Sequence, residues 1–274
     1  SNQVIGPALS PYNQGQGWQI YHGTSETNRD DTGLDDLAGT WVHVAYVRAS
    51  NQVRVYQNGV DVGATITDTT NYTNDEFSIG YYYNKASYDF EGYMSNFRVV
   101  KGTAVYTGNF TPPTEPLTAI TNTKLLTFCS NRFRDKSTSG HALLHSQSSA
   151  VNPMNSTNHP QIQPFSPFAP SAAYSASKGG SCFFNQTDNS ELYVSDATDF
   201  DFGTGDYTIE MWAYPTKTSF NNSWSMAINT TGVNQYWAWT DGAGNANAAG
   251  LSTSVSGGYS VDFADIPEPF QWSH

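Results

Sequence analysis

Apolar and polar residues alternate in short runs along most of the chain. In the clearest run, residues 41–48, alternate positions such as Val42, Val44 and Tyr46 would share one face of a strand. A period of two predicts a β-strand with one buried face. Similar runs occupy residues 53–57, 77–83, 90–100, 103–106, 124–129, 182–184, 191–194, 207–214 and 235–240.

Turn signals separate these runs. Asn58-Gly59 directly follows the run at 53–57, and both residue types tolerate the positive φ angles of a tight hairpin turn. No window of helical length keeps an apolar period of 3.6 residues. The pattern therefore predicts an all-β chain of short strands, as in sandwiches and barrels.

Composition limits the classes of function. Only 13% of the 274 residues are charged, the net charge is −12, and 14% are aromatic. Such an acidic chain lacks the basic surface that nucleic acid or an anionic membrane requires. No stretch approaches the roughly 18 consecutive apolar residues that favour membrane insertion. The aromatic content favours a packed core over disorder.

Two parts of the chain look alike. Residues 17–23 resemble residues 236–242, and a Trp-x-His triplet follows each, at 41–43 and at 272–274. Two similar pairs in the same order indicate a repeat. Between them, residues 146–178 form a Pro-rich stretch that we expect to lie extended along a surface.

Further motifs occur in a characteristic order. The first half carries Trp-Val-His-Val-Ala (41–45), Val-Tyr-Gln-Asn-Gly (55–59), Ile-Gly (79–80) and a long run from Asn96 to Pro113. The second half carries Leu-Leu (125–126), Asp-Lys-Ser (135–137), Gly-Gly-Ser-Cys-Phe-Phe (179–184) and a run from Phe202 to Pro215.

These motifs resemble the laminin-G-like, concanavalin-A-like jelly-roll domains repeated in bacteriophage structural proteins. The resemblance implies an antiparallel jelly-roll β-sandwich. It also implies two incomplete modules in tandem, because the first half matches the end of such a domain and the second half its beginning. We therefore expect residues 1–121 to be the later part of one module and residues 122–274 the opening part of the next, cut from a longer array.

Candidate catalytic groups are sparse. The glucanases of this fold alternate two glutamates and an aspartate along one strand, and no such motif occurs here. Glu210 stands alone among apolar residues, and His43 sits in mid-strand, as a hydrogen-bonded structural residue would. His141 and His145 are four residues apart, which on a strand is too far for one metal ion. We predict that the protein is not an enzyme.

Metal binding stays open. Some laminin-G-like domains bind calcium at the sandwich rim, and oxygen ligands such as Asp199, Asp201, Asp206, Asp241 and Asn245 are abundant in the turns. Abundance does not define a site, so we expect no cofactor, leave Ca²⁺ as an alternative and assign no ligands.

Aromatic residues are the best binding candidates, because sugars stack their C–H faces on Trp and Tyr. Trp237 and Trp239 share one face of a predicted strand, and Trp18 and Tyr21 occupy the matching segment of the first half. The alternative is that this face looks into the core. The sequence also holds two cysteines, Cys129 and Cys182, on what resemble the first two strands of the second module, which allows one disulfide.

The leading hypothesis is a non-catalytic phage virion protein, part of a tail fibre or a capsid-surface appendage. Its partners would be copies of itself or other virion proteins, together with cell-surface glycans, and it would lie on the virion surface. The alternatives are a secreted bacterial adhesin or filament subunit in an extracellular setting, or the carbohydrate-binding portion of a larger secreted enzyme.

Overall fold

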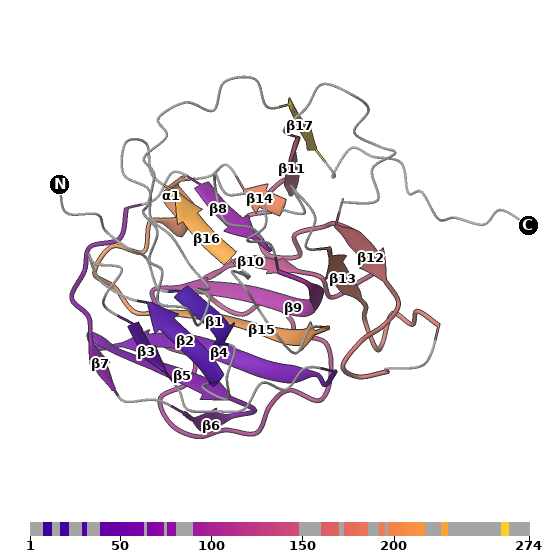
Figure 1. Ribbon diagram of the computed structural model, residues 1–274. Coiled ribbons are helices and arrows are strands. Elements are labelled where there is room, and N and C mark those ends of the chain that lie inside the picture. Colours follow the sequence, from indigo (N-terminus) through magenta and orange to yellow (C-terminus); the bar gives the residue numbers. More distant parts are fainter. Residues whose placement is uncertain are drawn as a thin grey trace, which may run out of the picture.

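The computed structural model is a β-sandwich with a few additional short strands (Figure 1). The structure describes residues 8–12, 17–21, 29–31, 39–62, 65–73, 76–80, 90–147, 160–169, 173–185, 192–194, 197–216, 226–229 and 259–262. The one helix within this part of the chain is α1, Ala197–Phe200.

The largest sheet has nine strands, paired in the order β12-β13-β9-β15-β4-β5-β6, with β10 on β9 and β7 on β5. Its strands are β4 (Val42–Ala49), β5 (Gln52–Gln57), β6 (Val60–Asp61), β7 (Ile66–Thr67), β9 (Gly92–Lys101), β10 (Thr123–Thr127), β12 (Gln161–Gln163), β13 (Ser181–Phe184) and β15 (Tyr207–Pro215). All of its pairings are antiparallel.

Two smaller sheets accompany it. The five-stranded sheet, in the order β16-β8-β14-β11-β17, consists of β8 (Glu76–Ile79), β11 (Leu144–Gln147), β14 (Leu192–Val194), β16 (Met226–Asn229) and β17 (Tyr259–Asp262). The three-stranded sheet consists of β1 (Ala8–Tyr12), β2 (Gly17–Tyr21) and β3 (Arg29–Asp31).

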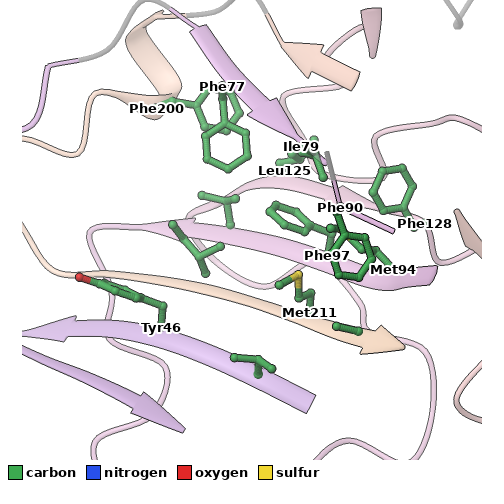
Figure 2. Close-up of a cluster of buried hydrophobic side chains, with 14 of the residues drawn as sticks. Tyr46, Phe77, Ile79, Phe90, Met94, Phe97, Leu125, Phe128, Phe200 and Met211 are labelled. Atoms are coloured by element: carbon green, nitrogen blue, oxygen red, sulfur yellow. The ribbon is translucent and has the colours of Figure 1, made fainter. Parts of the chain in front are cut away.

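The core lies between the nine-stranded and five-stranded sheets. Phe77 and Ile79 of β8 face the large sheet across the interior in Figure 2, where Phe97 and Met211 project toward them. Phe77 also stacks on Phe200 of α1, with ring centroids 4.6 Å apart. Two antiparallel sheets over one buried core confirm the predicted all-β sandwich.

Eight of the 17 described strands, including the three longest, β4, β9 and β15, fall where the alternating pattern predicted them. The Asn58-Gly59 turn is confirmed, with φ angles of 49° and 81°, and it joins β5 to β6. Residues 103–106 are an exception, because they form no strand and cross the face of the large sheet instead. The predicted strand at 235–240 lies outside the described residues.

The large sheet combines strands from both halves of the chain. β15 lies between β4 and β9, with Ile209 opposite both Tyr46 and Val99. The core likewise draws on residues from both sides of position 122. The expected division into separate modules at 121 and 122 is therefore not confirmed, since the described strands of the two segments share one sheet and one core.

Buried polar contacts join the same segments at the sandwich edge. The guanidinium of the fully buried Arg48 donates to the carbonyls of Gly205 (2.9 Å), Gly203 (2.6 Å) and Thr70 (2.8 Å). It also lies 3.6 Å from a carboxylate oxygen of Asp68. Arg48 thus fixes two loops from distant parts of the sequence against β4.

Candidate functional site: the outer face of the large sheet

The large sheet has an outer face that points away from the five-stranded sheet. Alternation along β15 sends Ile209 and Met211 into the core and Glu210, Trp212 and Tyr214 to the other side. We call that side the outer face, and β4, β9 and β13 contribute to it in the same way. Part of it is covered by another segment, and part presents aromatic rings.

The covering segment, residues 102–120, is here called the strap. It follows β9 and runs over the outer face to β10. Phe110 donates its amide to the carbonyl of Gly59 (2.9 Å), and Leu117 donates its amide to the side chain of Asn96 (2.7 Å). Tyr106 and Phe110 stack at 3.6 Å between ring centroids and pack on Tyr56. The motif from Asn96 to Pro113 therefore encodes the strap and its anchors.

Glu210 is the polar centre beneath the strap. One carboxylate oxygen accepts from Arg98 Nε (2.8 Å) and Nη2 (2.5 Å), and the other accepts from the Tyr106 hydroxyl (2.8 Å). The second oxygen also lies 3.2 Å from His43 Nε2. Arg98 in turn donates to the carbonyl of Thr118 (2.9 Å). Three strands and the strap thus meet at one buried carboxylate.

The environment of Glu210 favours its ionised form. Burial alone would raise the pKa of this carboxyl, but the hydrogen bond from His43, the positive charge of Arg98 and the hydroxyl of Tyr106 together lower it. Burial raises the pKa of Tyr106 most, and the charge and hydrogen bond of Glu210 raise it further. Protein donors thus already bond to both carboxylate oxygens of Glu210.

His43 is buried in mid-strand and contacts Glu210, an environment that fits the structural role expected for it. Its ring is fully buried between Glu210 and the rings of Trp212 (5.2 Å), Phe110 (5.6 Å) and Tyr106 (6.4 Å). Sequence reasoning did not identify Glu210 as its partner. Glu210 and His43 lie on outward positions of two different strands, and only the β15–β4 pairing brings them together.

Beyond the strap, aromatic residues cover the outer face. We call the set Trp41, Tyr93, Phe165, Phe183 and Tyr214 the aromatic face. All five side chains are partly exposed. They come from five separate parts of the chain, since Trp41 precedes β4, Tyr93 lies on β9, Tyr214 lies on β15, Phe183 lies on β13 and Phe165 follows β12.

The rings of the aromatic face contact one another. Phe165 lies at the centre, with ring centroids 4.9 Å from Tyr93, 5.0 Å from Trp41 and 5.0 Å from Tyr214. Phe183 extends the group, 4.9 Å from Tyr93. Partly exposed rings supported by a rigid sheet offer flat apolar surfaces of the kind on which the C–H faces of a sugar stack.

Two of the four residues predicted for glycan stacking belong to the described strands. Trp18 and Tyr21 are on β2 of the three-stranded sheet, where Trp18 is opposite Pro11 of β1. Trp237 and Trp239 lie outside the described residues. The residues of the aromatic face are scattered along the sequence. The one sequence signal for them was the presence of Tyr93 and Tyr214 at outward positions of two predicted strands, at 90–100 and 207–214.

Cys129 and Cys182 are free and buried, so the disulfide between them is not formed. β10 and β13 do not pair with each other, because they lie one after the other along the same edge of β9. Leu125 of β10 is opposite Val99, and Cys182 of β13 is opposite Met94. Burial raises the pKa of both thiols. They act as small apolar core residues.

Polar residues at the sandwich rim also have partners. Asp199 accepts from Lys124 (2.6 Å), from Ser139 (2.6 Å) and from His141 Nε2 (3.0 Å). Burial raises the pKa of Asp199, but the hydrogen bonds from Lys124 and Ser139 outweigh it and lower the pKa overall. Asp206 accepts the amide of Ser50. Within the described residues, no group of three or more His, Cys, Asp or Glu side chains is arranged to hold a metal ion.

Comparison with known proteins agrees with this fold. Residues 5–104 match the family model Laminin_G_3, described as the concanavalin A-like lectin/glucanases superfamily. The match covers the start of the chain through β9 and ends within the strap. Neither the curated proteins nor the solved structures give a significant match to the chain. No helix in the described part of the chain is long and apolar enough to cross a membrane.

Proposed function

We propose that the protein is a non-catalytic adhesion protein that binds polysaccharides through the aromatic face. The observation that carries this proposal is the contact of Phe165 with Trp41, Tyr93 and Tyr214 on a rigid sheet. The match of residues 5–104 to the lectin/glucanase superfamily supports it. The saturated hydrogen bonding of Glu210 supports a role without catalysis, because a glycosidase needs carboxyl groups that reach the substrate.

We further propose that the protein belongs to the surface of a phage virion, as part of a tail fibre or a capsid-surface appendage. The support is the resemblance of the motif at 96–113 to repeats of phage structural proteins. Several copies of the chain on one particle would bind a polysaccharide together, so that weak individual sites would give strong overall binding. Detection of the chain by mass spectrometry in purified virions tests this assignment, and a secretion signal in its gene would favour the bacterial adhesin or the secreted enzyme instead.

Substitution of the aromatic face tests the binding function. We expect Trp41→Ala and Tyr93→Ala each to weaken polysaccharide binding by about tenfold, because an aromatic anchor contributes on the order of 2 kcal/mol. Affinity electrophoresis against a panel of bacterial surface polysaccharides gives the measurement, and circular dichroism confirms that each variant is folded.

Tyr193→Ala is the matched control. Tyr193 is partly exposed on β14, between the inward-facing Leu192 and Val194 of the other sheet. Its loss removes an aromatic ring from the opposite side of the sandwich, so binding is expected to stay at the wild-type level. If all three variants bound as the wild type does, the aromatic face would not be the site.

A further inference from the structure

A turn from the Pro-rich stretch lies on the outer face of the large sheet. Residues 164–168, Pro-Phe-Ser-Pro-Phe, follow β12 directly, and we call them the cover. Phe165 of the cover packs on Trp41, with ring centroids 5.0 Å apart, and Phe168 packs on Trp212, with ring centroids 5.8 Å apart. The cover thus places one phenyl ring on each of two tryptophans.

These two tryptophans are neighbours on the sheet. Trp212 of β15 is opposite His43 of β4, and Trp41 comes two residues before His43. Because side chains two residues apart on a strand share a face, the two indoles are diagonal neighbours on the outer face. One oligosaccharide can therefore contact both of them.

Both indoles carry an unpaired N–H group. Trp41 Nε1 and Trp212 Nε1 are buried and have no hydrogen-bond partner in the described part of the structure. The phenyl rings of Phe165 and Phe168 contain no oxygen or nitrogen that could accept a hydrogen bond. A buried donor without an acceptor costs free energy, because it has lost its hydrogen bonds to water. An occupant with acceptor oxygens would satisfy the two donors that the cover leaves unpaired.

The Ser166 hydroxyl anchors the cover. It donates to the carbonyl of Lys178 (2.5 Å) and accepts the amide of Phe168 within the cover (3.2 Å). The pairing of β12 with β13 ends at Gln163, before the cover begins. Phe165 and Phe168 are only partly buried. The cover can therefore leave the sheet while β12 stays paired.

We propose that the cover is displaceable and that a neutral polysaccharide replaces it on the sheet. Sugar rings stack on Trp41 and Trp212 in place of Phe165 and Phe168, and their hydroxyl oxygens accept hydrogen bonds from the two indole N–H groups. The ligand is neutral because the groups that contact it, aromatic rings and indole donors, carry no charge. This inference rests on the proposed function, specifies its ligand class and adds Trp212 to the binding surface.

Removal of the two phenyl rings tests the proposal with the full chain. We expect the combined Phe165→Ala and Phe168→Ala variant to bind at least one of dextran, mannan and galactomannan about tenfold more tightly than the wild type does. This is the gain for a site that is otherwise uncovered about a tenth of the time. Affinity electrophoresis gives the measurement. Phe133→Ala is the matched control, because this ring packs against the core from the loop after β10 and its loss should leave the affinity unchanged.

Trp212→Phe tests the role of the indole N–H group. This variant keeps an aromatic ring and removes the donor, so binding of the same polysaccharide should weaken about fivefold, as for the loss of one hydrogen bond. Its stability toward urea should not fall, because the N–H group has no partner in the covered state.

Hydrogen exchange shows where the cover is when the polysaccharide is bound. The amides of Phe168 and Ala169 bond to Ser166 while the cover lies on the sheet. Addition of the tightest binder of the three polysaccharides should accelerate exchange at both amides, because the turn loses its packing on the sheet and its anchor on Lys178. A polysaccharide that lay on top of the cover would slow exchange there instead.

The outcomes separate this inference from the proposed function. Weaker or unchanged binding by the variant without Phe165 and Phe168, or slower exchange in the cover, would overturn displacement while polysaccharide binding stands. Absence of binding by both the wild type and this variant, to the three polysaccharides and to bacterial surface polysaccharides, would remove both proposals together.

Discussion

At the scale of single residues, Glu210 connects more of the structure than any apolar neighbour could. It accepts hydrogen bonds from Arg98 and Tyr106 and contacts His43, which belong to β9, the strap and β4. A buried charge is stabilising only while its partners surround it, and removing one member leaves the others uncompensated. The sheet and the strap therefore depend on the same carboxylate.

Replacement of this carboxylate should show a defined pH dependence. We expect Glu210→Gln to lower the free energy of unfolding by about 3 kcal/mol at pH 7, because Arg98 stays buried without its counter-charge. The folded-state pKa of Glu210 is lowered from its ordinary value near 4.5. Its ionic contribution is therefore complete above that value and is lost as the pH falls through the lowered pKa.

Urea denaturation of wild type and variant between pH 7 and pH 3 measures this effect. The two stabilities should converge toward acid. Glu115→Gln serves as the control, since this exposed side chain should change stability little at any of these pH values. A constant difference across the range would mean that the charge of Glu210 is not what stabilises the fold.

At the scale of elements, the hairpin of β5 and β6 holds the strap as well as itself. Asn58 accepts the amide of His43 and donates its own amide to the His43 carbonyl (2.8 Å), while the Gly59 carbonyl accepts from Phe110. Gly59 has a φ of 81°, and a Cβ there would lie 1.9 Å from the Phe110 carbonyl oxygen. Glycine is therefore required both for the turn and for the contact.

We expect Gly59→Ala to destabilise the protein by about 2 kcal/mol or more and to increase hydrogen exchange in the strap, because the substitution is strained and displaces Phe110. Gly108→Ala is the matched control within the strap, since no atom lies within 4 Å of a Cβ at that position. Equal stability of the two variants would argue that the strap is not seated on the hairpin.

The strap also marks the limit of prediction from sequence. Alternation identified β4, β5 and β9 because each has one face in the core. The same alternation at 103–106 predicted a strand, yet Val105 donates its amide to the side-chain hydroxyl of Thr208 on β15 and not to the backbone of a paired strand. An apolar period of two shows which side chains are buried. It does not show whether the segment is a strand within a sheet or a segment that packs across the face of a sheet.

At the scale of the whole molecule, β15 makes the two halves of the chain interdependent. It pairs with β4 on one side and β9 on the other, and its Met211 is buried in the shared core. The order of the motifs predicted that these strands belong to separate modules. Sequence similarity shows which known segments a stretch of chain resembles, and it does not specify which segments pair in the fold. The aromatic face was missed for the same reason, since Trp41 and Tyr214 meet only through this pairing.

Met211→Ala tests this interdependence. We expect a loss of about 2–5 kcal/mol, typical of a truncated buried methionine. Hydrogen exchange followed by mass spectrometry should show reduced protection in β4 and β5 as well as in β15 and β9. Exchange that increased only after residue 122, with β4 and β5 unchanged, would indicate that the halves fold separately.

The close approach of Gly39 and Pro215 has a mechanical consequence. Gly39 donates its amide to the Pro215 carbonyl (2.9 Å), so the chain enters β4 and leaves β15 at the same corner of the sheet. Tension applied at these two points pulls antiparallel neighbours apart from one end, which ruptures their hydrogen bonds one after another. A sandwich pulled at these two points opens at low force and lengthens as it opens. It would therefore extend before it passes the full force on to the neighbouring segments.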